Sequence, residues 1–264
     1  MKVCAVQIAA AVGDRAANMR KVEEQLALAA GHGIDVAVLP ELWDMGFYPV
    51  NALELGDPEG EQAKAFLAKQ AAKYKINLVG GSIIHKKDGK IRNRSYVFDR
   101  GGALVSQYDK IHLFSPSKEH ENFEAGDKLA VYELDGVPVG QIICYDIRFG
   151  ELVRTLALKG IKILFAPAAW PHPRLNHWRL LAQARAVENQ MFVVAVNTVG
   201  PVNNLTFCGH SIMVDPWGEI IAEAGGEEQL LVGKLDLAVI ADIRERINVF
   251  RDRRPELYDV QKPK

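Results

Sequence analysis

The chain has 264 residues, of which 48% are hydrophobic and 25% charged, and its formal net charge at pH 7 is −1. A sequence of this length and apolar content can bury the core of one large domain or two small ones. The nearly balanced charge offers no electrostatic basis for binding nucleic acid or an anionic membrane surface. The three cysteines are too few and too widely spaced for a disulfide framework or a zinc site, so we expect a reducing, cytoplasmic location.

In chain order, strand-like and helix-like patterns alternate for most of the length. Short apolar runs predict strands at Val3–Ile8, Val36–Leu39, Asn77–Ile84, Ser95–Asp99, Leu104–Tyr108, Ala130–Leu134, Val139–Cys144, Ile163–Ala166, Phe192–Asn197, Gly209–Val214, Ile220–Ala224 and Leu230–Leu235. Apolar residues at helical spacing predict helices at Ala16–Gly31, Gly60–Tyr74, Gly150–Leu158, Leu175–Asn189 and Ala238–Ile247.

The connections between these elements indicate an α/β fold. Tight turns at Asp88-Gly89 and Asp135-Gly136 predict hairpins, whereas other strands are joined through helices. Such a mixture favours a mixed sheet, or two sheets, with helices on the outer faces. No internal repeat or flexible linker divides the chain, so we expect a single domain over residues 1–264, ending in a polar arm at residues 245–264. No run is long enough to span a bilayer, and the first strand is too short for a signal peptide.

Cys144 is the first candidate for chemistry. It ends the predicted strand Val139–Cys144 and is followed at once by polar residues, which would bring the thiol to the rim of the sheet. Open α/β sheets hold their active sites at that rim, and a thiol there is a nucleophile if a base takes its proton. The alternative is a small, buried apolar side chain, which is what most free cysteines are.

Two further residues follow predicted strands and suit a partner role. Glu41 comes directly after Val36–Leu39 and Pro40, where burial would raise its pKa toward that of a useful base. It could equally be a helix N-terminal glutamate stabilised by the helix dipole. Lys110 follows Leu104–Tyr108 and is either a fixed cation of the site or an ordinary surface lysine. None of the seven histidines lies in a cysteine-protease signature, which favours a carboxylate base.

The three candidates stand in stretches that together resemble the nitrilase superfamily of carbon–nitrogen hydrolases. Glu41 lies in Leu39-Pro40-Glu41-Leu42, Lys110 in residues 108–114, and Cys144 in residues 143–149. The likeness covers nearly the whole chain and includes residues 166–170, 183–190, 209–211 and 214–218. The resemblance implies a four-layer α-β-β-α sandwich without cofactor or metal. It also implies a homodimer that continues the sandwich across an interface formed in part by the arm at 245–264.

The same resemblance implies a second acid and a mechanism. Glu119 stands four residues before Phe123 in a Phe-x-x-Gly-Asp stretch, although neighbouring glutamates leave the local assignment open and a solvated loop acid is the alternative. Glu41 would take the proton of Cys144, while Lys110 and the backbone N–H of Tyr145 would hold the oxyanion. Glu41, alone or with Glu119, would protonate the departing ammonia, and water would cleave the thioester.

A second set of stretches resembles one branch of the family, the ω-amidases: residues 119–121, 171–174, 177–179, 225–228 and 253–258. The ω-amidases hydrolyse the terminal amide of α-keto acid amides such as 2-oxoglutaramate and 2-oxosuccinamate. In such enzymes the arginine at the Arg148 position binds the carboxylate end of the substrate. The alternative is a structural ion pair of Arg148 with Asp146 or Glu151. The aromatic residues expected as pocket walls, which are also common in cores, are Phe47, Tyr48 and Trp170.

Three other functions stay open at this point. One is an amidase of the same superfamily acting on an N-carbamoyl compound or another aliphatic amide, and another is a nitrile hydrolase. The third is a protein that keeps the fold for an interaction and lacks catalysis. All three catalytic positions are intact, which favours an enzyme acting on a small-molecule amide.

Overall fold

The computed structural model describes residues 1–47, 51–202 and 205–258. Within these ranges the larger sheet has the order β16-β1-β2-β4-β6-β5-β3, with β7 paired to β6. Its strands are β1 (Lys2–Gln7), β2 (Val36–Val38), β3 (Asp57–Pro58), β4 (Asn77–Val79), β5 (Ile83–Lys87), β6 (Lys90–Phe98), β7 (Leu104–Asp109) and β16 (Gln229–Lys234).

The second sheet has the order β15-β14-β11-β10-β9-β8, and a separate hairpin is formed by β12 and β13. Strands β9, β10 and β11 run parallel to one another. The strands are β8 (Ala130–Leu134), β9 (Val137–Gln141), β10 (Ile163–Ala168), β11 (Phe192–Asn197), β12 (Val199–Val202), β13 (Leu205–Cys208), β14 (Ile212–Val214) and β15 (Ile220–Glu223).

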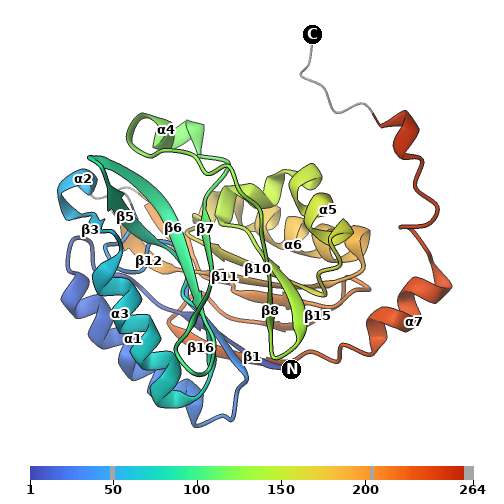
Figure 1. Ribbon diagram of the computed structural model, residues 1–264, viewed down its shortest axis with the longest axis horizontal. Coiled ribbons are helices and arrows are strands. Elements are labelled where there is room, and N and C mark those ends of the chain that lie inside the picture. Colours follow the sequence, from blue (N-terminus) through green and yellow to red (C-terminus); the bar gives the residue numbers. More distant parts are fainter. Residues whose placement is uncertain (48–50, 203–204, 259–264) are drawn as a thin grey trace.

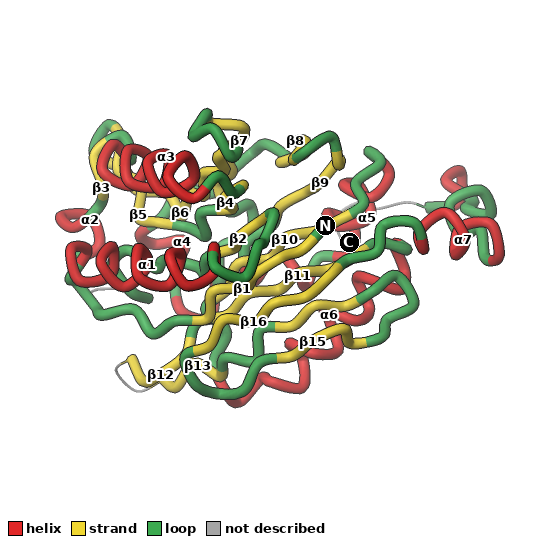
Figure 2. The backbone as a smooth tube through the Cα atoms, turned by 90° about the horizontal axis from the view of Figure 1, so that it is seen from below, coloured by secondary structure: helices red, strands yellow, loops and turns green. Residues whose placement is uncertain are grey.

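Helices cover the outer face of each sheet (Figures 1 and 2). Helices α1 and α3 pack on the first sheet, and α5 and α6 on the second, while α7 and the residues after it up to Tyr258 extend away from the body (Figure 1). No helix in the described ranges is both long enough and apolar enough to cross a membrane. The α-helices are α1 (Arg15–Ala30), α2 (Ala52–Leu55), α3 (Glu61–Tyr74), α4 (Glu119–Asn122), α5 (Gly150–Leu158), α6 (Leu175–Asn189) and α7 (Val239–Arg246). The 3₁₀ turns are η1 (Ser115–Ser117), η2 (Cys144–Arg148), η3 (His172–Arg174) and η4 (Pro255–Leu257).

The sequence of β1 explains why the sheets are covered on both faces. Successive side chains of a strand point to opposite faces of its sheet. Val3 and Ala5 belong to the core between the two sheets, whereas Cys4 and Val6 belong to the core beneath α1 and α3. Because both faces of this strand are apolar, each must be buried against another layer. The result is the expected four-layer α-β-β-α sandwich, which confirms the predicted fold class.

The topology brings several strand ends to one edge. Strands β1, β2 and β4 run parallel in the first sheet, as β9, β10 and β11 do in the second. The backbone N–H of Glu41, just beyond β2, donates to the carbonyl of Ala168 at the end of β10, at 3.3 Å. This hydrogen bond joins the carboxyl ends of the two sheets, and the polar residues that follow those strands therefore meet there.

Two differences between the predicted strands and the structure lie close to the candidate residues. Strand β9 ends at Gln141, so Cys144 does not lie in a strand but opens the 3₁₀ turn η2. The predicted strand Asn77–Ile84 is divided into β4 and β5 at Gly80 and Gly81. Gly81 has φ +59°, and a Cβ atom there would lie 2.1 Å from the carbonyl oxygen of Pro40. Only glycine fits this close approach to the backbone that leads to Glu41.

Candidate active site

Cys144 is held in a strained turn beyond β9. Its φ is +48°, in the left-handed region that non-glycine residues adopt rarely and at a cost in energy. The buried carboxylate of Asp146 fixes this turn. It accepts hydrogen bonds from the backbone N–H of Ile143 at 3.0 Å, from the Tyr108 hydroxyl at 2.7 Å and from the His112 backbone N–H at 2.8 Å. The turn is therefore anchored by its own preceding residue, by β7 and by the segment that follows β7.

Three buried charges meet beside this turn. The Nζ of Lys110 lies 2.8 Å from Oε1 of Glu41 and 2.9 Å from Oε2 of Glu119. The side chains of all three residues are at most 1% exposed. Burying charges is costly unless they are paired and hydrogen-bonded, and here one ammonium is shared by two carboxylates. We call Glu41, Lys110, Glu119 and Cys144 the catalytic cluster.

Neutral donors satisfy the remaining oxygens of the two acids. The side-chain amide of Asn93 donates to Oε1 of Glu41 at 2.7 Å and to Oε1 of Glu119 at 3.2 Å. The backbone N–H of Ala169 donates to Oε2 of Glu41 at 2.8 Å, and that of Phe114 donates to Oε2 of Glu119 at 2.6 Å. These bonds hold both carboxylates in one orientation, so the base does not need to reorganise during a reaction.

The electrostatics of the catalytic cluster suit proton transfer from sulfur to a carboxylate. Burial raises the pKa of Glu41, the charge of Glu119 raises it further, and Lys110 opposes both effects. Burial also raises the pKa of Cys144, as does the charge of Glu41, with Lys110 again opposing. The thiol therefore keeps its proton at rest, and the carboxylate that faces it is a stronger base than an ordinary glutamate.

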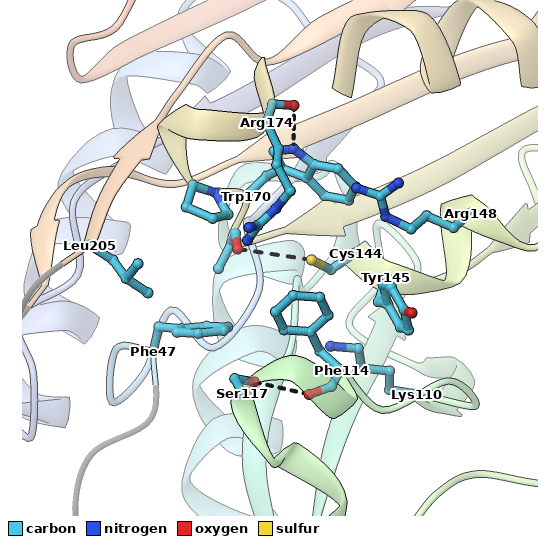
Figure 3. Close-up of a pocket in the computed structure, with 12 residues that line it drawn as sticks. Phe47, Lys110, Phe114, Ser117, Cys144, Tyr145, Arg148, Trp170, Arg174 and Leu205 are labelled. Carbon is cyan, nitrogen blue, oxygen red and sulfur yellow. Dashed lines mark hydrogen bonds between the residues drawn. The ribbon is translucent and has the colours of Figure 1, made fainter. Parts of the chain in front are cut away.

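A narrow pocket leads to the sulfur of Cys144 (Figure 3). Its cavity volume is about 40 Å³. The Cys144 Sγ lies 3.9 Å from the Ala169 carbonyl oxygen, to which the thiol donates. The pocket is lined by Phe47, Lys110, Phe114, Ser117, Cys144, Tyr145, Arg148, Ala169, Trp170, Pro171, Arg174 and Leu205.

The structure brings the sequence-predicted residues together with one gap. Glu41, Lys110, Glu119 and Cys144 form one cluster, and Tyr145, Arg148, Phe47 and Trp170 all line its pocket. Tyr48 lies outside the described residues.

Several of the alternative interpretations are wrong. Lys110 is not a surface lysine and Glu119 is not a solvated loop acid, because each is 1% exposed. Arg148 does not pair with Asp146, whose carboxylate is taken by other donors. Its guanidinium instead lies 4.8 Å from the centre of the Trp170 ring and contacts Nδ1 of His177 at 3.2 Å.

Two residues of the site, Asn93 and Arg174, carry no signal in the sequence. Asn93 lies within the predicted hairpin as one polar residue among several in Lys90–Phe98, and nothing local marks its side chain as buried. Arg174 lies in the stretch 171–174, which contributed to the resemblance but suggested no role for this residue. Its position beside the pocket depends on how η3 leads from β10 into α6, which is a tertiary property.

Comparison with known proteins decides the family. Residues 2–245 match the carbon–nitrogen hydrolase family. This chain belongs to that family. It is therefore a hydrolase of carbon–nitrogen bonds, and the resemblance seen in its sequence is confirmed.

Members of the family with known names are similar over almost the full length. A 2-oxoglutaramate amidase of Bacillus subtilis is 41% identical, with 97% of this chain and 98% of that protein covered. An omega-amidase of Danio rerio is 36% identical, with 93% and 92% covered. A crystal structure of a carbon–nitrogen hydrolase from Helicobacter pylori superposes with a TM-score of 0.92 at 26% identity, covering 98% of this chain and 96% of the other.

Proposed function

We propose that this enzyme hydrolyses the terminal amide of a short α-keto acid amide, such as 2-oxoglutaramate or 2-oxosuccinamate, to the acid and ammonia. The observation that carries the proposal is Arg148, a half-buried cation at the pocket of Cys144. Among the described residues it forms no ion pair with a carboxylate. A guanidinium in this position is suited to the carboxylate of an anionic substrate. The names of the Bacillus subtilis and Danio rerio relatives agree with this substrate class.

The first half of the reaction forms a thioester. Glu41 takes the thiol proton as the sulfur of Cys144 attacks the amide carbon, and the carbonyl electrons move to oxygen. Lys110 and the backbone N–H of Tyr145 stabilise this oxyanion. When the oxyanion collapses, the carbon–nitrogen bond breaks, and the proton held by Glu41, or one relayed through Glu119, passes to the nitrogen. Ammonia leaves, and the acyl group stays on sulfur.

The second half regenerates the enzyme. Water enters the place left by ammonia and gives a proton to the same carboxylate as its oxygen attacks the thioester carbon. The carbon–sulfur bond breaks, the thiol regains a proton, and the carboxylic acid leaves. The sum is one amide and one water converted to one acid and one ammonia. Because Glu41 and Glu119 are held by fixed donors, both halves can use the same geometry.

Ammonia release from a set of four compounds tests this proposal. The set contains 2-oxoglutaramate, its neutral analogue 4-oxopentanamide, in which a methyl group replaces the carboxylate, the cationic N-carbamoylputrescine, and an aliphatic nitrile. We expect kcat/KM for 2-oxoglutaramate to exceed that for 4-oxopentanamide by at least about tenfold, the value of one charge-assisted hydrogen bond. Turnover of the carbamoyl compound alone would overturn the substrate class, and no release from any compound would favour a non-catalytic interaction protein.

We further propose that the single domain of residues 1–264 forms a homodimer through α5, α6 and the arm at 245–264. Support comes from exposed apolar side chains on these segments, where soluble monomers rarely gather them: Leu158, Leu180, Val187, Ile247, Leu257 and Tyr258. Light scattering of the full chain and of a chain ending at residue 244 would test this, since the shorter chain should be monomeric. A cytoplasmic location fits the unbridged cysteines of the described residues, and cell fractionation would check it.

A further inference from the structure

Arg174 lines the same pocket and has no part in the catalytic cluster. It ends η3 and directly precedes α6. Its half-buried side chain enters the pocket between Trp170 and Phe114 (Figure 3), with the guanidinium carbon 5.3 Å from the centre of the Phe114 ring. This side chain therefore approaches Cys144 from one wall, whereas Arg148 approaches from another.

Trp170 contacts both arginines. Its indole N–H donates to the carbonyl oxygen of Arg174 at 2.8 Å, and its ring carries the guanidinium of Arg148 at 4.8 Å. Trp170 is itself held, because its backbone N–H donates to Oδ1 of Asn197 at 2.6 Å. Trp170 thus contacts the guanidinium of Arg148 and the backbone of Arg174, so this wall of the pocket is ordered before an anion binds.

No acid among the described residues neutralises either cation. Within residues 1–47, 51–202 and 205–258 no carboxylate forms an ion pair with Arg148 or Arg174, and the contact from Arg148 goes to a histidine nitrogen. Other arginines of α6 are paired: Arg179 lies 2.7 Å from Glu223, and Arg185 lies 2.7 Å from Glu188. Burial lowers the pKa of Arg148, and the charge of Arg174 lowers it further, so the two like charges are near enough to repel.

We propose that Arg174 is a second carboxylate-binding residue, which together with Arg148 holds the anionic end of the amide substrate beside Trp170. The inference rests on the proposed function and adds a residue that determines specificity. A carboxylate has enough lone pairs to accept from two guanidinium groups at once. An anionic substrate relieves the repulsion between the arginines, a neutral amide leaves it in place, and a cationic one increases it. The pair therefore selects for charge at the end of the substrate remote from the amide.

The test compares Arg174→Met and Arg174→Lys with a control, Arg20→Met, which removes an exposed arginine from α1. We expect Arg174→Met to lower kcat/KM for 2-oxoglutaramate by about tenfold to a hundredfold, mainly through KM, as expected for lost charge-assisted bonds. The same variant should change kcat/KM for 4-oxopentanamide by less than about twofold. Arg174→Lys should recover part of the loss, because a point charge replaces the planar fork.

A binding measurement separates recognition from catalysis. In a Cys144→Ala background, calorimetry should find that Arg174→Met weakens the binding of 2-oxoglutaramate by about tenfold or more, whereas Arg20→Met leaves it unchanged. If Arg174→Met harmed both substrates equally, Arg174 would have a structural role and this inference would fail while the proposed function stood. A parent enzyme with no activity on 2-oxoglutaramate would overturn both.

Discussion

The catalytic cluster and the arginine pair at its pocket, Arg148 and Arg174, handle charge in opposite ways. In the catalytic cluster Lys110 is within 3 Å of both Glu41 and Glu119, and all three are buried. At the pocket, two half-buried guanidinium groups have no acid partner within the described residues. Fully buried charges must be paired within the protein, whereas charges that line an open pocket can be stabilised by solvent and then by a bound ligand. In our proposal, the first arrangement serves the reaction and the second selects the substrate.

The largest expected effect comes from removing the sulfur. Cys144→Ala should lower kcat by at least about 10⁴-fold, because no other group in the cluster can form the thioester. Cys4→Ala, at a buried cysteine beneath α1, is the matched control and should keep its activity. Ammonia release and thermal unfolding of both variants make the comparison. Near-normal turnover by Cys144→Ala would show that the nucleophile is another residue.

Removing the Lys110 ammonium, which Glu41 and Glu119 share, should lower both the stability of the protein and its turnover. Lys110→Met leaves Glu41 and Glu119 buried without a counter-charge, so we expect a loss of about 3–5 kcal/mol in the free energy of unfolding together with loss of turnover. Urea denaturation at pH 7 measures the first effect. Lys73→Met removes an exposed lysine paired with Glu23 and should leave the free energy of unfolding almost unchanged. Equal stability of the two variants would contradict the account of the cluster.

At the pocket, a smaller change should affect specificity alone. Arg148→Lys keeps the charge but loses the planar fork and its stacking on Trp170. We expect KM for 2-oxoglutaramate to rise about tenfold, with little change for 4-oxopentanamide. Steady-state kinetics with both substrates measure the difference. An equal rise for both would remove Arg148 from substrate recognition.

The smallest expected effect is a shift in the pH profile. Glu41 must be deprotonated to act as a base, and burial raises its pKa above the ordinary value of 4.5, so kcat/KM should fall as the pH drops through this raised pKa. The negative charge of Glu119 contributes to the increase. Glu119→Gln removes that charge and should therefore move the acidic limb to lower pH, whatever it does to the maximum rate. A shift to higher pH would contradict the assignment of that limb to Glu41.

Much of the fold follows from local pattern. The predicted helices Gly150–Leu158 and Leu175–Asn189 and the strands Ala130–Leu134 and Phe192–Asn197 have the bounds found in the structure, because their apolar spacing matches their burial. The predicted strand that corresponds to β6 begins only at Ser95, since four of the five residues 90–94 are charged or polar. The local pattern of apolar residues does not predict a strand whose polar side chains find their hydrogen-bond and ion-pair partners far away in the sequence.

The residues of the site were predictable where a charged or reactive side chain stands at a position that would bury it, because such burial costs free energy unless the side chain is paired or functional. Glu41 and Lys110 after predicted strands and Cys144 at the end of one carry such signals, and the resemblance to the family supplied Glu119. Asn93 and Arg174 carry none, because each works through contacts with residues far away in the sequence. The left-handed backbone of Cys144 was also beyond prediction, since it depends on the Asp146 carboxylate that anchors η2.

The most direct test of the central claim is acid quenching of the enzyme during turnover of 2-oxoglutaramate, followed by peptide mass spectrometry. If Cys144 is the nucleophile, one keto-acyl group will be bound as a thioester to the peptide that contains Cys144, and no such group will be found on the peptides of Cys4 or Cys208. Ammonia release with the acyl group on another residue, or with no acyl-enzyme under conditions that trap thioesters, would contradict it.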